Sequence, residues 1–359
     1  LFCNIGDISF CYHNNGNYES ACYLRAKFGI IILVVMDYAY KTLGVVLPCY
    51  NVSQHLSEVV QSLPDYVRHI IIVNDKSSDT TAEIINNLAA SDKRIVPLEH
   101  AENQGVGGAV LTGMKKALEL ECDYILKLDG DGQMDSKYIP DLLEPLVKNG
   151  FHFAKGNRFN DFHALRQMPF IRRAGNLMLS FLIKAASGYW SVFDPTNGFF
   201  CIKKETLEKI DFARIEKRYF FESSLLVELY YTGAKICDVP IPARYGNEKS
   251  GLSVIHTIFT FPVRITKAFA RRILLKYYIY DFNIFSIYFM IGAPLLLFGL
   301  VFGIIKWIHY GTANVPAPTG TVMLATLSVI LGIQLLLSVI QYDISSENPF
   351  SDDFTIRKG

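Results

Sequence analysis

The sequence predicts an α/β fold, in which a mostly parallel sheet with helices on both faces is followed by interfacial amphipathic helices and two transmembrane helices. Three patterns along the 359 residues predict it. Short apolar runs alternate with amphipathic stretches up to about residue 250, a basic and aromatic-rich stretch comes next, and two long apolar runs follow. Strands that alternate with helices of ~10–15 residues form right-handed crossovers, which give a parallel sheet.

The alternating pattern assigns the elements of residues 41–250 in order. Runs rich in Val, Ile and Leu between turn residues are typical of buried strands, and we expect them at residues 43–47, 69–73, 94–98, 124–128, 151–155, 198–202 and 235–239. Stretches with apolar residues three and four apart are typical of helices, and we expect them at residues 53–63, 78–90, 105–120, 136–148, 170–187 and 219–231. The carboxyl ends of the parallel strands then meet at one edge of the sheet.

Residues 1–40 show no regular period and are treated as an N-terminal extension of uncertain order. The apolar stretch 28–36 is shorter than the ~20 residues that span a bilayer. It has no basic n-region and no cleavage site, so we do not interpret it as a signal peptide. Because the chain begins with Leu1, Met36 is a candidate start of the native protein.

Residues 251–281 predict interfacial amphipathic helices, because five cations interrupt apolar and aromatic residues there: Arg264, Lys267, Arg271, Arg272 and Lys276. The apolar runs 284–307 and 320–341 are each near the length of a membrane span, so residues 282–342 form a predicted two-helix anchor. Their length and lack of charge argue against two buried core helices. Positive charge precedes the first run, which places the α/β part and the tail 343–359 in the cytoplasm.

The sharpest local motif is Asp129-Gly-Asp131-Gly-Gln133, which follows a predicted strand. Carboxylates two residues apart can face one cation, with Gln133 as a third oxygen ligand, and such oxygens suit Mg²⁺ or Mn²⁺. A calcium-binding EF-hand loop is excluded, because Met134 and Pro140 stand where that loop needs Gly and Glu. A solvated Asp/Gly turn stays open for this motif alone.

Other polar turns also follow predicted strands and are expected to converge on the same crevice: residues 48–51, 74–75 and 103–105. The glycines from Gly105 to Gly108 do not make a dinucleotide-binding loop, since Val110 takes the place of the third glycine. A phosphate-binding P-loop motif is absent from the sequence. The formal net charge of +1 gives no field that would attract nucleic acid, so no nucleic-acid partner is expected.

In combination, these motifs resemble the family 2 glycosyltransferases of the GT-A fold. The segments that carry the resemblance are Leu47-Pro-Cys-Tyr-Asn51, Val73-Asn-Asp75, Asn103-Gln-Gly105 and Asp129-Gly-Asp131. Three later segments are similar to the polyprenyl-phosphate branch, which includes dolichyl-phosphate mannose synthases and undecaprenyl-phosphate glucosyltransferases: Lys155-Gly-Asn-Arg158, Asp194-Pro-Thr-Asn-Gly-Phe199 and Arg244-Tyr-Gly-Asn-Glu-Lys-Ser250. The resemblance covers about residues 42–342.

The resemblance implies an inverting, metal-dependent enzyme that moves a hexose from a UDP- or GDP-sugar to a polyprenyl phosphate at the cytoplasmic membrane face. Residues 41–250 would be its GT-A catalytic domain. The implied nucleotide-sugar ligands are Pro48, Tyr50, Asn51, Asp75, Asp129, Gln133 and Lys249. The implied acceptor-phosphate ligands are Arg158, Arg172, Arg173 and Arg244. Asp131, Arg158 and Glu222 would be catalytic, and Asp129, Asp131 and Gln133 would hold Mg²⁺ or Mn²⁺.

Two departures from the family pattern bear on this interpretation. Val52 follows the Tyr-Asn pair where many members have Glu or Asn, and Ser223 replaces the second acid after Glu222. A lipid phosphate is already an anion near neutral pH, so it needs no strong general base.

Competing interpretations are weaker. A processive synthase should show Q-x-x-R-W, and neither Trp190 nor Trp307 lies in that setting. A nucleotidyltransferase would need a Gly-rich basic loop after the first strand. An inactive transferase-fold membrane scaffold or lipid-binding subunit is the alternative of a different class. The identity of the sugar, nucleotide and polyprenol, and assembly into a homo-oligomer, stay open.

Overall fold

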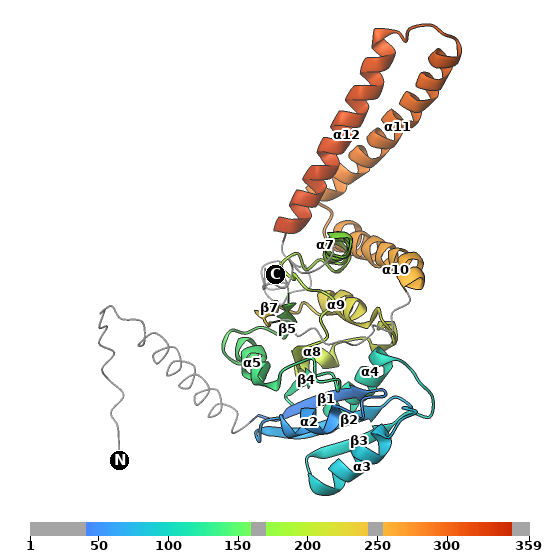
Figure 1. Cartoon of the computed structure of the whole chain (residues 1–359). Helices are drawn as coiled ribbons and strands as arrows, with labels where there is room; N and C mark the ends of the chain where they lie inside the picture. Colours follow the sequence, from blue (N-terminus) through green and yellow to red (C-terminus); the bar gives the residue numbers. More distant parts are fainter. Residues whose placement is uncertain (1–40, 159–169, 243–253, 347–359) are drawn as a thin grey trace, which may run out of the picture. The chain divides into compact units, whose positions relative to one another are not determined.

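The computed structural model describes residues 41–158, 170–242 and 254–346, which are drawn in colour in Figure 1. By its contacts the chain divides into residues 1–41 and residues 42–359, and everything below concerns the second unit. The predicted N-terminal extension, residues 1–40, lies outside the described residues.

A seven-stranded sheet forms the centre of the α/β part. Its strands are β1 (Leu43–Cys49), β2 (Val67–Asn74), β3 (Ile95–Glu99), β4 (Tyr124–Lys127), β5 (Phe153–Asn157), β6 (Phe200–Lys203) and β7 (Ile236–Pro240). Their order across the sheet is β3-β2-β1-β4-β6-β5-β7. The pairs β1–β2, β1–β4, β2–β3 and β5–β7 are parallel. The predicted mostly parallel sheet is therefore confirmed.

Strand β6 is the exception, because it runs antiparallel to both of its neighbours. Cys201 pairs with Leu126 of β4 on one side and with Ala154 of β5 on the other. Hydrophobic period predicts that a strand exists and not its direction. The chain therefore enters β6 at the edge where β4 and β5 end, as the pairing of Phe200 with Lys127 and Lys155 requires.

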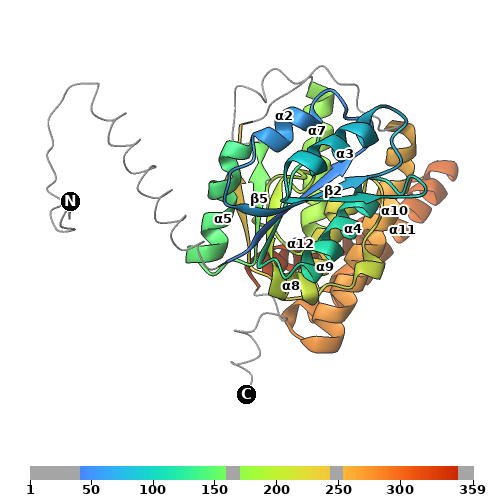
Figure 2. The ribbon, with the colours of Figure 1, turned by 90° about the horizontal axis from the view of Figure 1, so that it is seen from below.

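Helices cover both faces of the sheet, as Figure 2 shows for α2 (Leu56–Gln61) and α3 (Thr81–Ser91) on one side and α4 (Val106–Glu119) and α9 (Phe221–Tyr231) on the other. The remaining helices of this part are α5 (Ile139–Lys148), α7 (Phe170–Ser187) and the short α8 (Lys204–Glu208). Short 3₁₀ turns precede α5 and follow α8, at Ser136–Tyr138 and Phe212–Arg214.

The core on the α4 and α9 side is packed closely by small residues. A Cβ added at Gly113 of α4 would overlap the side chain of Val46 on β1. Val46 and Ile71 of the sheet, Met114 of α4 and Phe221 of α9 belong to one buried apolar cluster. Close contact between α4 and β1 therefore depends on the absence of a side chain at Gly113.

The C-terminal part begins with α10 (Val254–Leu274) and a π-helical turn (Leu275–Tyr280). Helices α11 (Ile284–Thr312) and α12 (Thr319–Ser345) follow, and both are long and apolar enough to cross a membrane. Only 11% and 17% of their most apolar windows are buried, unlike the core helices of a soluble protein. The predicted pair of transmembrane helices is confirmed as two such helices, and α12 runs four residues beyond the predicted end of its span.

Glycines allow α11 and α12 to pack closely against each other. A Cβ at Gly292 would lie 2.8 Å from Cβ of Leu335, and one at Gly332 would lie 2.7 Å from the backbone nitrogen of Leu296. Small residues of this kind let two helical backbones approach closely where lipid gives no hydrophobic drive between them.

Candidate active site

A cavity of about 370 Å³ opens at the carboxyl ends of β1 and β2. Three of the predicted nucleotide-sugar ligands line it, namely Pro48, Tyr50 and Asp75. The other lining residues come from the end of β1, from the loop before α4, from α4 itself and from the segment before α9: Cys49, Asn103, Gly105, Val106, Ala109, Arg218 and Tyr219. Polar turns far apart in the sequence therefore meet here because their strands are neighbours in the sheet.

Asp75 is held tightly at the end of β2. Its Oδ2 accepts a 2.7 Å hydrogen bond from the backbone N–H of Gly105, and its Oδ1 accepts one of 2.9 Å from that of Gln104. The Nδ1 atom of His100 lies 2.7 Å from the same Oδ1, and Asn103 donates from Nδ2 to the Asp75 carbonyl at 3.1 Å. This buried carboxylate closes the loop before α4 and so shapes one wall of the cavity.

Asn51 lies at the end of β1 in the left-handed region, with φ of 54°. Its backbone N–H donates to Oγ of Ser77 at 3.1 Å, and its Oδ1 accepts from the N–H of Ser78 at 2.8 Å. Asparagine tolerates this conformation better than most residues because its short side chain bonds locally. Asn51 thus ties the turn after β1 to the turn after β2, and it does not line the cavity itself.

The Asp129–Gln133 turn follows β4 and packs on the cavity wall. A Cβ at Gly130 would lie 3.0 Å from Sγ of Cys49, a lining residue. Burial, together with the nearby charges of Asp129 and Asp131, raises the pKa of the Cys49 thiol well above its usual range. The Oδ1 atom of Asp131 accepts a 3.0 Å hydrogen bond from the N–H of Gln133. The turn and the cavity are therefore adjacent parts of one site.

Asp129 also pairs with a buried lysine. The Nζ atom of Lys127, whose side chain is 1% exposed, lies 2.6 Å from Oδ1 of Asp129. A Cβ at Gly198 would overlap that Nζ and would lie 3.3 Å from Oε1 of Glu222 and 3.4 Å from Oδ2 of Asp129. Lys127, Asp129 and Glu222 therefore surround Gly198. Burial raises the pKa of Glu222, and the Lys127 charge opposes that rise.

Arg158, at the end of β5, makes a bidentate pair with Asp194. Its Nε donates to Oδ2 at 2.8 Å and its Nη2 to Oδ1 at 3.1 Å. Asp194 is fully buried, whereas the Arg158 side chain is 39% exposed. Burial acts to raise the pKa of Asp194, but the guanidinium of Arg158 outweighs it and holds the pKa below its ordinary value. Because the carboxylate binds both Nε and Nη2, the guanidinium of Arg158 is held in one defined orientation.

A second buried lysine, Lys155, lies where the charges of both Asp194 and Glu222 act on it. Lys155 of β5 donates from Nζ to the carbonyl of Asn197, and Nδ2 of Asn197 donates to the carbonyl of Gly156 at 2.7 Å. Burial lowers the pKa of Lys155 to about 8, although the charges of Asp194 and Glu222 act to raise it. The segment that enters β6 is thus bonded to β5 just before Gly198.

Four of the predicted phosphate and diphosphate ligands have no described side chain. Arg244 and Lys249 are outside the described residues, and Arg172 and Arg173 are on α7 without described side chains. The sequence reasoning gave no role to Lys127, Arg218 or the carboxylate of Asp194. The sequence did contain an indication for Lys127. It is a lone cation within an apolar strand, and a buried charge of this kind requires a partner.

The oxygen atoms of the turn suit a divalent cation that arrives with a ligand. Within the described ranges, no three His, Cys, Asp or Glu side chains form a cluster that could hold a metal ion. Mg²⁺ is commonly held by one or two carboxylates together with substrate phosphates, and it does not need a cage of protein ligands. Asp129, Asp131 and Gln133 fit this mode, because they supply two carboxylates and an amide on a turn that packs against the cavity wall.

Comparisons with known proteins converge on one family. The family described as Glycosyl transferase family 2 matches residues 44–211. A UDP-N-acetylglucosamine–dolichyl-phosphate N-acetylglucosaminyltransferase of Methanococcus voltae is 30% identical over 220 residues, 58% of this chain and 87% of that protein. An undecaprenyl-phosphate mannosyltransferase of Micrococcus luteus is 28% identical over 203 residues, 55% of this chain and 81% of that one.

A solved structure is similar to a lesser degree. It is glucosyl-3-phosphoglycerate synthase from Mycobacterium tuberculosis in complex with Mg²⁺ and uridine diphosphate. It has 18% sequence identity and a TM-score of 0.49, with 67% of this chain and 83% of that chain covered. This similarity is too low to carry an assignment of ligands.

Proposed function

Since the chain belongs to glycosyl transferase family 2, we propose that it transfers a hexose from a UDP- or GDP-linked sugar to the phosphate of a polyprenyl phosphate. The observation that carries the proposal is the continuity of the site. The cavity at the ends of β1 and β2 adjoins the Asp129–Gln133 turn through Cys49, and Asp129 lies beside Gly198, which comes four residues after the Asp194 carboxylate that binds Arg158. We therefore propose that a donor site, a diphosphate site and an anion site follow one another in this order.

The donor half uses the cavity for the nucleotide. Pro48, Tyr50 and Asp75 border the base and ribose, with Asn51 holding the turn that carries Tyr50. Lys249 is proposed to contact the diphosphate from its loop. With Mg²⁺ or Mn²⁺ bound at Asp129, Asp131 and Gln133, the cation would offset the negative charge that develops on the leaving diphosphate. Lys127 pairs with Oδ1 of Asp129 from the buried side, and Oδ2 of Asp129 lies beside Gly198.

The acceptor half uses Arg158, with Arg172, Arg173 and Arg244 as further proposed phosphate ligands. One oxygen of the lipid phosphate attacks the anomeric carbon from the side opposite the diphosphate. A bond forms between that phosphate oxygen and the anomeric carbon. The bond between the anomeric carbon and the diphosphate oxygen breaks, and the configuration at that carbon inverts. The electron pair of the broken bond leaves with the diphosphate.

No proton has to be removed from the attacking group, because the lipid phosphate is already an anion near neutral pH. Glu222 is therefore proposed to act by its attraction for Lys127, which in turn pairs with Asp129, and not as a base. Arg158 contributes by holding the phosphate near the reacting carbon, and the rate gain from such positioning is large.

The membrane half of the proposal rests on α11 and α12. Both helices have the length and hydropathy of membrane spans, and cations precede the first of them. The positive-inside rule supports a cytoplasmic α/β part. An acceptor whose lipid tail lies in the bilayer would then be met from the cytoplasmic surface.

The test is a transfer assay with the full chain in nanodiscs. Wild type is supplied with labelled UDP- and GDP-hexoses, polyprenyl phosphate and Mn²⁺, and the lipid product is identified by mass spectrometry. Asp131→Ala should lower the rate at least 100-fold, because it removes a carboxylate from the proposed cation site. The matched control is Asp65→Ala, which makes the same change at an exposed acid between α2 and β2.

Two results would defeat the proposal. One is the absence of transfer by wild type with every common donor. The other is full activity of Asp131→Ala under the same conditions. Metal-dependent binding of the nucleotide diphosphate without any transfer would instead favour the inactive, lipid-binding alternative.

A further inference from the structure

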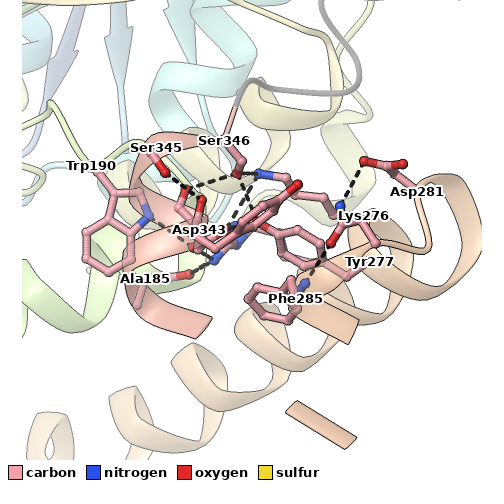
Figure 3. Close-up of polar contacts among 12 residues, drawn as sticks. Ala185, Trp190, Lys276, Tyr277, Asp281, Phe285, Asp343, Ser345 and Ser346 are labelled. Atoms are coloured by element: carbon pink, nitrogen blue, oxygen red, sulfur yellow. Dashed lines mark hydrogen bonds and ion pairs between the residues drawn. The ribbon is translucent and has the colours of Figure 1, made fainter. Parts of the chain in front are cut away.

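Side chains from the α/β part and from the start of the C-terminal part converge on one carboxylate at the end of α12, and we name this group the Asp343 clasp (Figure 3). Arg272 of α10 donates from Nη1 to Oδ1 of Asp343 at 2.8 Å and from Nη2 to Oδ2 at 2.7 Å. The same guanidinium donates to the carbonyl of Ala185 on α7, at 3.1 Å from Nε and 2.7 Å from Nη2. The clasp thus joins α7, α10 and α12.

Three further groups complete the clasp, and one of them is Lys276, whose Nζ lies 3.5 Å from Oδ1 of Asp343. The hydroxyl of Tyr277 donates to Oδ1 of Asp343 at 2.5 Å, and Nε1 of Trp190 donates to Oδ2 at 3.0 Å. Arg272 and Asp343 are almost fully buried, with side chains 1% and 4% exposed. Charges at this depth persist only where partners satisfy them, so the geometry of the clasp is tightly specified.

Trp190 connects the clasp to the active site along a short segment of chain. Four residues after it comes Asp194, the carboxylate that fixes Arg158. Between them, the backbone N–H of Phe193 donates to Oδ2 of Asp238 on β7 at 2.6 Å. The segment is therefore held at the clasp by Trp190, at the sheet by Phe193 and at the acceptor-side arginine by Asp194.

We propose that Asp343 and Trp190 are positioning residues for Arg158, so that the last turn of α12 fixes where the acceptor phosphate is held. The inference rests on the proposed function, in which the acceptor is a membrane lipid. A lipid phosphate lies at a fixed depth relative to the membrane helices. Linking Arg158 to the end of α12 keeps its guanidinium at that depth.

A purely structural clasp would only attach the anchor to the α/β part, and Trp190→Phe separates the two roles. It removes the indole N–H that reaches Asp343, keeps an aromatic ring, and leaves the Arg272–Asp343 pair intact. Asp343→Asn removes the charge of the clasp itself. Ser345→Ala is the matched control, since its hydroxyl bonds only to carbonyls of its own helix.

The experiment measures steady-state transfer in nanodiscs together with hydrogen–deuterium exchange of the same full-length proteins. Trp190→Phe should raise the KM for polyprenyl phosphate at least fivefold while the KM for the donor changes less than twofold. Amide exchange within residues 191–197 should quicken at least fivefold in Trp190→Phe and in Asp343→Asn. Ser345→Ala should match wild type in every measurement.

The outcomes separate this inference from the proposed function. An unchanged acceptor KM in Trp190→Phe, with wild-type transfer present, overturns the inference and leaves the proposed function standing. Absence of transfer by wild type counts against the proposed function, and the exchange data then decide alone whether α12 positions this segment. Exchange equal to wild type in Trp190→Phe overturns it in either case, even where Asp343→Asn fails to fold.

Discussion

Replacing Asp75 by Asn should loosen the loop that forms one wall of the cavity at the ends of β1 and β2. The asparagine keeps one acceptor oxygen, and its amide group must face a donor that the carboxylate now satisfies. If the amide takes the place of Oδ2, the N–H of Gly105 loses its partner, and the bonds from Gln104 and His100 lose the negative charge that strengthens them. A hydrogen bond to a charged group contributes about 1.5–3 kcal/mol, so the expected loss is about 2–4 kcal/mol.

The assay is thermal unfolding of the full chain in detergent. A domain of this size loses about 2–4 °C in Tm for each kcal/mol, so Asp75→Asn should lower the Tm by roughly 4–16 °C. Glu102→Gln is the matched control, because it makes the same change of carboxylate to amide at an exposed position of the same loop. Equal Tm values for the two variants would show that the Asp75 carboxylate does not hold the loop.

Three further variants test other parts of the structure. Gly198→Ala should lower transfer at least tenfold without unfolding the protein, because its methyl group displaces the buried lysine beside it, whereas Gly175→Ala meets nothing within 4 Å and should leave the rate unchanged. Gly332→Ala should lower the stability in detergent by about 1–3 kcal/mol, because its methyl group meets the α11 backbone, while Gly320→Ala should not. Lys155→Met should change the pH dependence of urea unfolding. The pKa of Lys155 is lowered to about 8 from 10.5, so between these pH values the folded chain has lost a proton that the unfolded chain still holds. The free energy of unfolding of wild type should therefore rise by up to about 3 kcal/mol relative to the variant as the pH rises through this range. A parallel pH profile in both proteins would refute this.

Most elements of the fold could be predicted because the hydrophobic period is strong where strands and helices alternate. The expected helix 170–187 agrees with α7 at both ends, and the expected strand 124–128 differs from β4 by one residue. The antiparallel direction of β6 could not be predicted, because an apolar run has the same pattern in either direction. The helix α8 was also missed, since five residues carry too little periodicity to be recognised.

The candidate site divides in the same way. Turns that follow parallel strands could be predicted to meet, since the sheet brings those ends together, and Pro48 and Asp75 line one cavity. Pairings between distant segments could not be predicted. Arg158 was expected to face a phosphate, but nothing near it in the sequence indicates that Asp194 takes both of its nitrogens. Asp343 was assigned to the tail, because its burial depends on Arg272, 71 residues earlier.

Because β6 runs antiparallel to its neighbours, the residues at this edge of the sheet come from separate segments of the sequence. Parallel strands contribute the residues that follow them to the ligand edge, whereas β6 contributes the residues that precede it, from Asp194 to Gly198. The cavity wall is thus encoded before residue 134 and again near Arg218, while the segment that orients Arg158 is encoded between them. Under the proposed function, substitutions or insertions upstream of Asp194 would change the acceptor side of the site, while the register of β1, β2 and β4, which carries the donor side, stays intact.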